Sequence, residues 1–527
     1  MTALEESGMD TTAGRIAEYR RRRTESLEPG SPRAARRQHV LGKFTARERL
    51  DMLLDKDSFV EIGSLARHRS TNFGTDSRRP PGDGVVAGYG TVDGRPVAVF
   101  AQDVTSFTGS VGEVFGHKVG KVLDHAMRVG CPVVGLYDSS GARVHEGVLS
   151  LASFGQVARR VVGASGVVPQ ISVIMGVCAG GAVYTPAATD FVVMVEKTSH
   201  MFVTGPDVIR AVNGETVGME ELGGARLHVA RTGNACHMAP DEPAALDYVK
   251  DLLSFLPGNN LEEPPSHPVV ADLGESTVDR ELDEVIPDLP AHGYDVLEVI
   301  SRLVDDGYLL EVHEEFARNI VCGFAHIEGR PVGVVANQPA HLAGVLDIDA
   351  AEKAARFVRF CDAFGIPLLT LVDVPGFLPG TGQEHAGIIR RGAKLGFAYI
   401  EATVPKITVI TRKAFGGGYA VMASKEFGAD LVLAWPTAEI GVMGAGGGVG
   451  LLFHKEITAS ADPEAARRAY TSQYYETLVS PYVAAESGCV DDVVAPSETR
   501  AHLVRAIRTL RTKRVVTPPR KHSNIPL

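Results

Sequence analysis

The sequence lacks the features of several common classes of protein. Only six of its 527 residues are cysteines, and no two of them form a Cys-x-x-Cys pair, which argues against a zinc ribbon or a thioredoxin-type redox site. Positive charge is not in excess either, since the net charge is −11, and this argues against a nucleic-acid surface as the main role. Neither a Gly-x-Ser-x-Gly elbow nor a Walker A loop occurs. We therefore expect no bound metal and no nucleic-acid partner.

Hydrophobic segments of the kind that direct secretion or span a membrane are also missing. Residues 1–10 are acidic and have no apolar core, so we expect no secretory signal and, with no disulfide pattern, a cytoplasmic location. Residues 161–189 carry no charge and are long enough to cross a bilayer. They contain two prolines, five glycines and the polar pair Gln170 and Ser172, however, which predicts a buried strand, turn and helix rather than a membrane helix.

Glycine is the residue present in excess. There are 57 glycines, about 11% of the chain, against a usual ~7%. A surplus of this kind indicates many tight turns, or a backbone that ligands approach closely. With 44% hydrophobic and 22% charged residues the chain is otherwise ordinary and globular. Its length exceeds one hydrophobic core and suggests two to four domains of about 150 residues.

Four landmarks recur along the chain in the same order. Gly-Arg-Pro-Val at residues 94–97 returns at residues 329–332, an offset of 235. Two apolar strands that end at Asp138 and Asp373 have the same offset, and the strand at residues 168–174 matches residues 404–410 with an offset of 236. A looser match links residues 53–61 to residues 303–311. Four ordered matches indicate a tandem duplication.

Strands alternate with helices in each copy, which predicts an α/β fold with mainly parallel central strands. Prolines and acidic residues replace apolar periodicity at residues 256–290, so we place the two domains at residues 41–265 and 266–527. Residues 1–40 are rich in arginine. This segment is interpreted as a solvated or subunit-contacting helical extension, broken near Pro29 and Pro32, rather than as a nucleic-acid or membrane arm.

In each copy the third strand runs into a glycine turn that begins a helix of small residues. The turns are Gly180-Gly181 and Gly416-Gly417-Gly418. Uncovered N–H groups at a helix N-terminus can bind a developing oxyanion without any ionisable side chain. Tight turns are the alternative interpretation, but their matching positions favour function. Two oxyanion holes facing one cavity suit a reaction between two carbonyl-bearing partners that pass through enolate-like states.

Side-chain candidates for catalysis are weaker. His145-Glu146 and Glu384-His385 each offer a possible general base, yet neighbouring residues do not share a helix face, which favours surface-loop polarity instead. Cys236-His237 has no companion at metal-ligand spacing. Residues 444–448 are interpreted as a flexible glycine loop, because a dinucleotide fingerprint would need a strand and helix around it.

Several of these motifs together resemble one known family. Ser-Ser-Gly-Ala-Arg at 139–143, Cys-Ala-Gly-Gly-Ala at 178–182, Trp-Pro-Thr-Ala-Glu-Ile at 435–440 and the opening segment at 42–50 are similar to the carboxyltransferase (beta) subunit of biotin-dependent acyl-CoA carboxylases, of the propionyl-CoA carboxylase type. The resemblance covers roughly residues 15–527. It implies two tandem crotonase-like (ClpP/crotonase) βα-superhelix domains and a homo-hexamer whose active sites form between the N-domain of one subunit and the C-domain of another.

The resemblance also implies roles for particular residues. Gly180 and Gly181 would hold the acyl-CoA thioester oxygen in the N-terminal, acyl-CoA domain, and Gly417 and Gly418 the biotin ureido oxygen in the C-terminal, biotin domain. The implied acyl-CoA neighbours are Gly141, Ala142, Arg143, Ala182, Tyr184 and Ala420. The implied biotin neighbours are Phe377, Phe415, Gly416 and Tyr419.

The reaction implied by this resemblance moves CO2 from carboxybiotin to the α-carbon of an acyl-CoA. Carboxybiotin would release CO2, the biotin anion would take the acyl α-proton, and the enolate would attack CO2. The chain has neither a Met-Lys-Met biotinylation site nor an ATP-grasp region. ATP use and the biotin carrier are therefore expected in a partner biotin carboxylase (alpha) subunit. The absence of a four-cysteine zinc ribbon separates the chain from the split acetyl-CoA carboxylase beta subunit.

Two departures from the family pattern concern the substrate. Ala420 stands where the propionyl type usually has an aspartate in the acyl pocket, which predicts a longer or otherwise different acyl group. The loop at residues 442–448 also lacks a glutamate that the family often has. Two alternatives stay open: a carboxyltransferase subunit of a biotin-dependent decarboxylase or transcarboxylase, and a non-catalytic assembly subunit.

Overall fold

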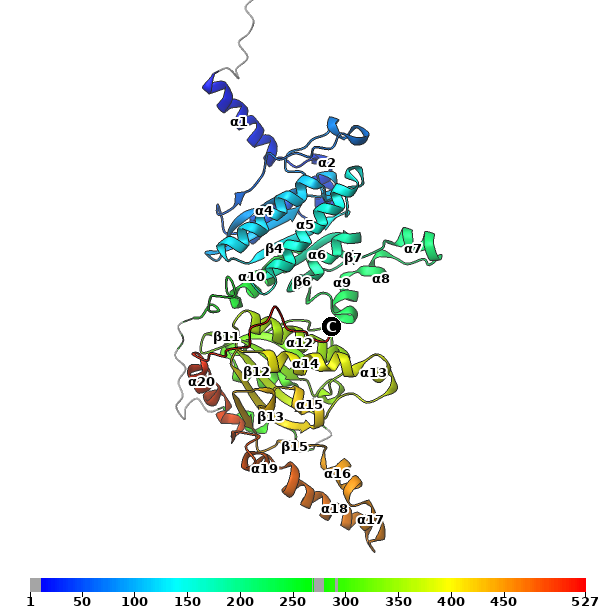
Figure 1. Cartoon of the computed structure of the whole chain (residues 1–527), viewed down its shortest axis with the longest axis vertical. Coiled ribbons are helices and arrows are strands. Elements are labelled where there is room, and N and C mark those ends of the chain that lie inside the picture. The colour runs from blue at the N-terminus through cyan, green and yellow to red at the C-terminus, as the bar shows by residue number, and fades with distance from the viewer. Residues whose placement is uncertain (1–10, 268, 270–278, 290–291) are drawn as a thin grey trace, which may run out of the picture. The chain divides into compact units, whose positions relative to one another are not determined.

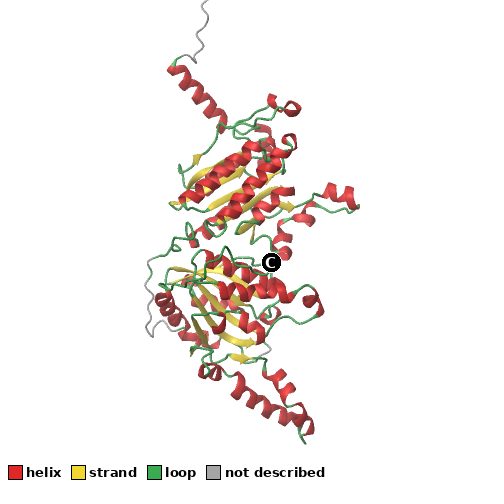
Figure 2. Ribbon diagram, viewed as in Figure 1, coloured by secondary structure: helices red, strands yellow, loops and turns green. Residues whose placement is uncertain are grey.

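The computed structural model describes residues 11–267, 269, 279–289 and 292–527 (Figure 1). The chain divides into two compact units, Met1–Leu261 and Glu262–Leu527. Residues 1–10, for which the sequence predicts no secretory signal, lie outside the described residues, as does part of the proline-rich segment at 256–290. Each unit contains one sheet with helices packed on it (Figure 2).

The sheet of the first unit is antiparallel at one edge and parallel through its centre. The order is β1-β2-β3-β4-β5-β6-β8, with β7 pairing with the end of β5. Strands β1 to β3 pair antiparallel, and the pairs from β3 to β8 are parallel. Its strands are β1 (Val60–Glu61), β2 (Val85–Val92), β3 (Arg95–Gln102), β4 (Val133–Ser139), β5 (Gln170–Ala179), β6 (Phe191–Val195), β7 (His200–Phe202) and β8 (His237–Ala239).

The sheet of the second unit repeats this topology strand for strand. The order is β9-β10-β11-β12-β13-β14-β16, with β15 pairing with the end of β13. Its strands are β9 (Leu310–Glu311), β10 (Ile320–Ile327), β11 (Arg330–Asn337), β12 (Leu368–Val374), β13 (Lys406–Phe415), β14 (Leu431–Ala434), β15 (Glu439–Gly441) and β16 (Asp492–Val493). The predicted α/β fold of two similar domains is confirmed.

Matching helices connect the strands of the two units. After the antiparallel hairpin come α4 (Glu113–Val129) and α12 (Ile348–Ala363), and before the third parallel strand come α5 (Val148–Ala164) and α14 (Ile388–Glu401). The units close with α10 (Glu242–Phe255) and α20 (Thr499–Leu510). Every residue of β4 and β12 is buried, as expected for parallel strands covered on both faces.

The uncharged stretch at residues 161–189 belongs to this core. It comprises the end of α5, all of β5 and the short helices η5 (Gly180–Val183) and α6 (Tyr184–Ala187), so the predicted strand, turn and helix are confirmed. Among the described residues, no helix combines the length and the apolar character that crossing a bilayer requires.

The arginine-rich segment near the N-terminus forms two helices. Helix α1 (Thr12–Leu27) ends before Pro29, and α2 (Pro32–Val40) begins at a proline, the residue best tolerated in a first turn. Thr11 and Ser31 cap the two helices with their side chains. Arginines of α1 pair with Glu18 on the same helix, which suits a solvated face.

In each unit a group of helices projects from the domain after the short strand β7 or β15 (Figure 1). Helices α7 (Pro206–Asn213) and α8 (Met219–Gly223) follow β7, and α16 (Ala445–Leu452), α17 (His454–Ala459) and α18 (Pro463–Tyr474) follow β15 (Figure 1). The helices that follow β15 have a small hydrophobic core of their own, formed by Val449, Ile457, Tyr474 and Val479.

A buried lysine at matching positions ties a helix to the hairpin in each unit. Lys118 on α4 donates to the carbonyl oxygens of Gly82 (2.9 Å) and Val85 (2.5 Å). Lys353 on α12 donates to the carbonyl oxygen of Ile320 at 2.8 Å, the counterpart of Val85. Burial lowers the pKa of Lys118 to about 8. Each ammonium group binds backbone carbonyl oxygens at the start of β2 or β10 or in the segment just before it.

The buried ammonium of Lys118 predicts how stability depends on pH. Because its folded-state pKa lies below the unfolded value, the unfolded chain binds more protons between the two, and stability rises with pH across that window. We expect wild type to gain about 2 kcal/mol between about pH 7.5 and about pH 10 relative to Lys118→Met. Urea unfolding at both pH values measures this difference. Lys121→Met, at an exposed position of the same helix, is the control and should keep the wild-type slope.

A second matched pair consists of glycines that lie against the ends of β4 and β12. Gly109 and Gly344 have φ of +66° and +75°. A Cβ atom on Gly109 would lie 2.3 Å from the carbonyl oxygen of Asp138, and one on Gly344 would lie 2.4 Å from that of Asp373. Both the left-handed backbone and the close approach require glycine here. These contacts fix the segment before α4 or α12 onto the strand end.

We expect Gly109→Ala to lower the free energy of unfolding more than the same substitution at a glycine that has a positive φ but no close neighbour. Gly94 is the matched control, because its φ is +74° and no described atom lies within 4 Å of the position of its Cβ. Crowding against Asp138 should cost Gly109→Ala about 2 kcal/mol beyond the loss in Gly94→Ala, measured by chemical denaturation. Equal losses would show that the close approach contributes nothing.

Candidate functional site

The two glycine turns occupy the same place in their units. Strand β5 ends at Ala179 and η5 begins at Gly180, while β13 ends at Phe415 and α15 (Gly416–Val421) begins at Gly416. The strand register gives an offset of 236, so Gly180 corresponds to Gly416, and their φ values are +68° and +58°. In the described structure no side chain caps either helix, so the first N–H groups of both turns lack a side-chain acceptor.

Three of these glycines border open space. No described atom lies within 4 Å of where a Cβ would stand on Gly180 or Gly181. On Gly417 the nearest atom is the Phe377 ring, at 3.9 Å. Gly181 and Gly417 are also exposed, and they correspond to one another in the register. A ligand atom can therefore approach the backbone of both turns.

Gly418 differs from the other predicted glycines. It is buried, and a Cβ there would lie 2.9 Å from the Cα of Gly376. Its counterpart in the first unit is Ala182, which is 2% exposed. Close packing against the loop after β12 thus requires a glycine at 418. Of the four glycines to which the resemblance gives oxyanion roles, this one is packed inward.

The loops after β4 and β12 run across the ends of the turns. Gly141, with φ of +96°, would place a Cβ 3.0 Å from the carbonyl oxygen of Ala179. Isolated parallel bridges pair Val111 with Ala142 and Leu346 with Phe377, so Ala142 and Phe377 are counterparts. The two loops therefore present different side chains at equivalent positions.

Phe377 supplies an aromatic wall to the second turn. A Cβ on Gly392 of α14 would stand 3.1 Å from its ring, so the ring packs on the helix backbone as well as beside Gly417. In the first unit the small, exposed Ala142 stands at the corresponding position. The second turn accordingly has a flat apolar wall that the first turn lacks.

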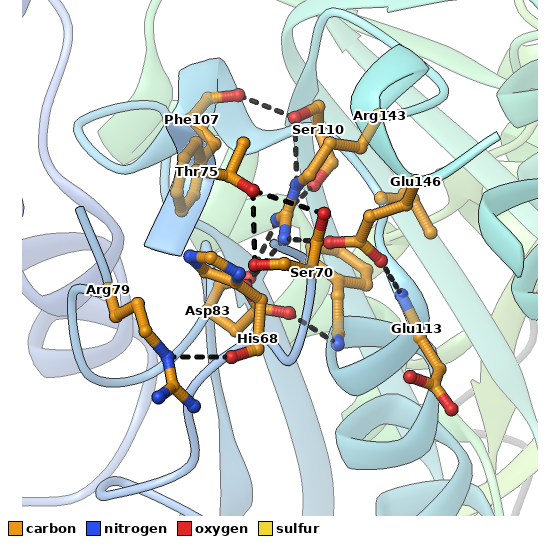
Figure 3. A network of polar contacts seen from close by, with 12 residues as sticks. His68, Ser70, Thr75, Arg79, Asp83, Phe107, Ser110, Glu113, Arg143 and Glu146 are labelled. Carbon is orange, nitrogen blue, oxygen red and sulfur yellow. Dashed lines mark hydrogen bonds and ion pairs between the residues drawn. The ribbon is translucent and has the colours of Figure 1, made fainter. Parts of the chain in front are cut away.

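Arg143 is buried within a polar network of the first unit (Figure 3). Its guanidinium donates to Asp83 at 2.6 Å and to Glu146 at 2.9 Å. The interpretation of His145-Glu146 as surface polarity is therefore wrong for Glu146, which is 7% exposed because Arg143 holds it inside. His145 is exposed.

The other residues that the resemblance implies lie in varied surroundings. Tyr184 is 61% exposed, while Phe415 is buried against Gly444. Ala420 lies on α15 and is partly buried. Burial raises the pKa of the Tyr419 hydroxyl, and the carboxylate of Glu426 adds to this shift. That hydroxyl has no hydrogen-bond partner among the described residues.

The remaining sequence candidates do not assemble into a site. Glu384 and His385 are exposed on α13 (Thr381–His385), and the ring of His237 stacks on Tyr248 at 3.9 Å. Within the described ranges, no group of three or more histidine, cysteine or acidic side chains is placed to hold a metal ion.

The predicted flexible loop at residues 444–448 is wrong, because residues 445–448 form the first turn of helix α16. A Cβ on Gly448 would lie 2.3 Å from the Tyr474 ring of α18, so a glycine is needed for the two helices to pack. Tertiary packing outweighs the poor helix propensity of glycine here.

The two aspartates at matching positions of the repeat, Asp138 and Asp373, are buried and paired with cationic side chains. Asp138 pairs with Lys43 at 2.7 Å and with Arg49 at 3.0 Å, and Asp373 pairs with Arg412 at 2.9 Å. They are the next-to-last residues of β4 and β12, which pair with β5 and β13, the strands that lead into the glycine turns. Their partners lie far away in the chain and are not indicated by the local sequence.

Comparison with known proteins decides the family. A family model described as the carboxyl transferase domain matches residues 37–525. The chain belongs to the carboxyl transferase family. This carboxyl transferase is 61% identical to the propionyl-CoA carboxylase beta chain of Saccharopolyspora erythraea over 528 residues, covering 98% of this chain and 96% of that protein. It is 49% identical to the methylmalonyl-CoA decarboxylase subunit alpha of Propionigenium modestum, covering 98% of this chain and 100% of that one.

A solved structure of a carboxyl-transferring enzyme also matches this chain. The transcarboxylase 12S, described as a hexamer with methylmalonyl-coenzyme A and methylmalonic acid bound, matches with a TM-score of 0.95 and 49% identity. The match covers 98% of this chain and 99% of the transcarboxylase chain. The expected two-domain crotonase-like fold and the expected enzyme class, a carboxyltransferase, are thereby confirmed.

Proposed function

We propose that the chain is the carboxyltransferase component of an acyl-CoA carboxylase, which moves CO2 from carboxybiotin on a partner carrier protein to the α-carbon of an acyl-CoA. One observation carries this proposal. Each unit has an open glycine turn at the same register, Gly180-Gly181 and Gly416-Gly417, with N–H groups that no side chain caps in the described structure. The reaction joins two carbonyl-bearing groups and needs one such turn for each.

In the first turn, the N–H groups of Gly180 and Gly181 would donate to the thioester oxygen of the acyl-CoA. Negative charge gathers on this oxygen when the α-proton leaves and the enolate forms. Fixed donors that face the developing charge lower the barrier without having to reorganise. The enolate carbon then attacks CO2 and forms the new carbon–carbon bond.

The second turn fits the ureido group of biotin. The Phe377 ring beside Gly417 gives a flat apolar wall, and the N–H groups at Gly416 and Gly417 would receive the ureido oxygen. Carboxybiotin, when bound, supplies the CO2 and, once that is released, a basic nitrogen. The role of this chain is to orient the ring and to hold its oxygen.

This mechanism does not require a catalytic base on the chain. His145, Glu384 and His385 are exposed, and Glu146 is occupied by Arg143. The backbone turns therefore carry the proposed catalysis, in keeping with the excess of glycine.

The acyl group is proposed to be longer than propionyl or of a different shape. Ala420, on the first helix after β13, stands where the propionyl type usually carries an aspartate. A small apolar side chain removes a polar wall from the acyl pocket and leaves room for further methylene groups.

The proposed function also implies a partner subunit and an oligomeric assembly. ATP use and the biotinylated carrier would belong to a biotin carboxylase (alpha) subunit, and the chain would form a homo-hexamer with active sites between the N-domain of one subunit and the C-domain of another. Exposed apolar side chains on α5 and α14 support burial against further subunits; they are Val148 (74%), Leu151 (61%), Val162 (65%), Ile389 (80%) and Ile400 (60%). Six free cysteines, five of them buried, suit the proposed cytoplasmic location.

A second candidate keeps the site and reverses the reaction. The Propionigenium modestum relative is named a decarboxylase subunit, and turns that stabilise an enolate serve decarboxylation equally well. A non-catalytic assembly role is less well supported, because open and uncapped turns would then have no purpose. A soluble biotin carboxylase partner in a pull-down would favour carboxylation, and a membrane pump subunit would favour decarboxylation.

We expect Gly181→Val and Gly417→Val to abolish turnover without unfolding the protein. Both side chains would enter open space, so melting temperatures should stay near that of wild type, while carboxylation in the reconstituted complex should fall at least about 100-fold. Gly218→Val, at an exposed glycine just before α8 with extended backbone and no described atom within 4 Å of its Cβ position, is the control and should keep activity. Full activity in either turn variant would contradict the two-turn mechanism.

A substrate panel tests both the reaction and the acyl group. The purified chain is mixed with its biotinylated partner, ATP, labelled bicarbonate and acyl-CoAs of increasing length. We expect label in acyl-CoAs longer than propionyl-CoA, and a shift of kcat/KM toward propionyl-CoA in Ala420→Asp, by about 10-fold. If no acyl-CoA is labelled, the carboxylase proposal is wrong. Label in propionyl-CoA alone would contradict only the inference from Ala420.

A further inference from the structure

We propose that Arg143 is a positioning residue for carboxyl transfer: it fixes the loop at residues 140–147 against the end of β5 and so sets the acyl-side turn at Gly180 and Gly181. The inference rests on the proposed function and assigns Arg143 a role other than substrate contact. The loop meets the turn through Gly141, whose Cβ position is 3.0 Å from the carbonyl oxygen of Ala179, one residue before the turn.

The guanidinium of Arg143 is held on every side (Figure 3). Nη1 donates to carboxylate oxygens of Asp83 (2.6 Å) and Glu146 (2.9 Å), and Nη2 donates to the carbonyl oxygen of Ser110 at 2.8 Å. The Phe107 ring lies 4.5 Å from the guanidinium carbon. The side chain is 4% exposed. These contacts occupy the groups with which an arginine would bind a substrate phosphate or carboxylate.

The two carboxylates bound by Arg143 also cap helix α4. Glu146 accepts from the backbone N–H of Glu113 at 2.6 Å, and Asp83 accepts from that of Phe115 at 2.9 Å. Gly112, the residue before the helix, has no side chain to do this. A Cβ there would lie 2.6 Å from Arg143 and from Glu146, so glycine leaves room for the network. One arginine thus joins the loop after β4, the segment before β2 and the start of α4.

The second unit shows that the fold does not need this arrangement. The residue at the position of Gly112 is Asp347, which caps α12 in the ordinary way by accepting from Ala350 N–H at 2.9 Å. Leu378 stands at the position of Arg143, and Arg318 at that of Asp83. The same sheet and the same bridge form without the ionic network. The network is therefore particular to the unit that we assign to the acyl-CoA.

The shape of arginine explains why the loop geometry depends on it. A planar guanidinium binds two carboxylates and a carbonyl at fixed angles, whereas a lysine ammonium keeps the charge and lacks this fork. Displacing a substrate-holding turn by a fraction of an ångström costs rate more than binding. Arg143→Lys should accordingly displace the backbone of the turn at Gly180 and Gly181, while the net charge of the network stays the same.

The test compares Arg143→Lys with Arg160→Lys, an arginine of α5 in the same unit that pairs with Asp124 at the surface. Hydrogen–deuterium exchange is measured without substrate on peptides at residues 140–147 and 177–184, with residues 412–421 as the internal reference. We expect faster exchange at the first two segments only. In the reconstituted complex kcat should fall about 10- to 100-fold, with KM for acyl-CoA within about threefold of wild type. Arg160→Lys should match wild type in both measurements.

A neutral variant, Arg143→Met with Asp83→Asn and Glu146→Gln, separates positioning from folding. It removes the buried charges and keeps the acceptors that cap α4, so it should fold even where Arg143→Lys does not. Faster exchange and a low kcat in this stable variant support the proposal. Recovery of kcat together with stability would overturn it, as would unchanged exchange at residues 177–184 or a rise in KM alone. If wild type carboxylates no acyl-CoA, the proposed function fails, while the exchange result still decides the positioning role.

Discussion

Asp138, the next-to-last residue of β4, has its carboxylate inside the protein, where a charge is tolerated only if it is paired. Lys43 and Arg49 pair with it, and Arg49 also binds Glu242 of α10 at 2.6 Å. Segments from the beginning and the end of the unit therefore meet at the end of one central strand. The carboxylate further presses on β5, where a Cβ on Gly176 would lie 1.9 Å from it. The strand that leads into the turn at Gly180 and Gly181 is thus located by this buried charge.

The second unit pairs the corresponding carboxylate with one cationic side chain instead of two. Asp373 is bound by Arg412 of β13 and also accepts from the backbone N–H of Lys413 at 3.1 Å, so the pairing cation comes from the strand that leads into the second turn. The duplication kept the strands, the paired glycines and the buried lysines. What changed are the groups around the turns: Ala142 against Phe377, and the network of Arg143 against a leucine. A shared framework with different walls is what two different ligands require.

Much of the fold could be predicted from the sequence, because its signals are local. Apolar runs, strand-ending aspartates and glycine turns at a nearly constant offset were enough to indicate two α/β copies. Contacts between distant segments were not predictable. Glu146 looks like a surface residue until Arg143 and Asp83 are placed beside it, and Asp83 lies 60 positions from Arg143. Gly418 differs from Gly417 through the close approach of Gly376 and of the Val374 side chain. The helix at residues 445–452 packs on Tyr474 through Gly448, a contact with a residue 26 positions away that the local sequence does not reveal.

The N–H groups of the turn glycines differ from catalytic side chains in the substitutions that can remove them. The groups proposed to face the ligand are backbone amides, which do not titrate in the range where the protein is folded and which every residue except proline carries. Truncating a side chain within a turn would leave these amides in place. The proposed site is therefore reached by atoms added at Gly180, Gly181 or Gly417, or by a change such as that at Arg143, which shifts a turn from outside.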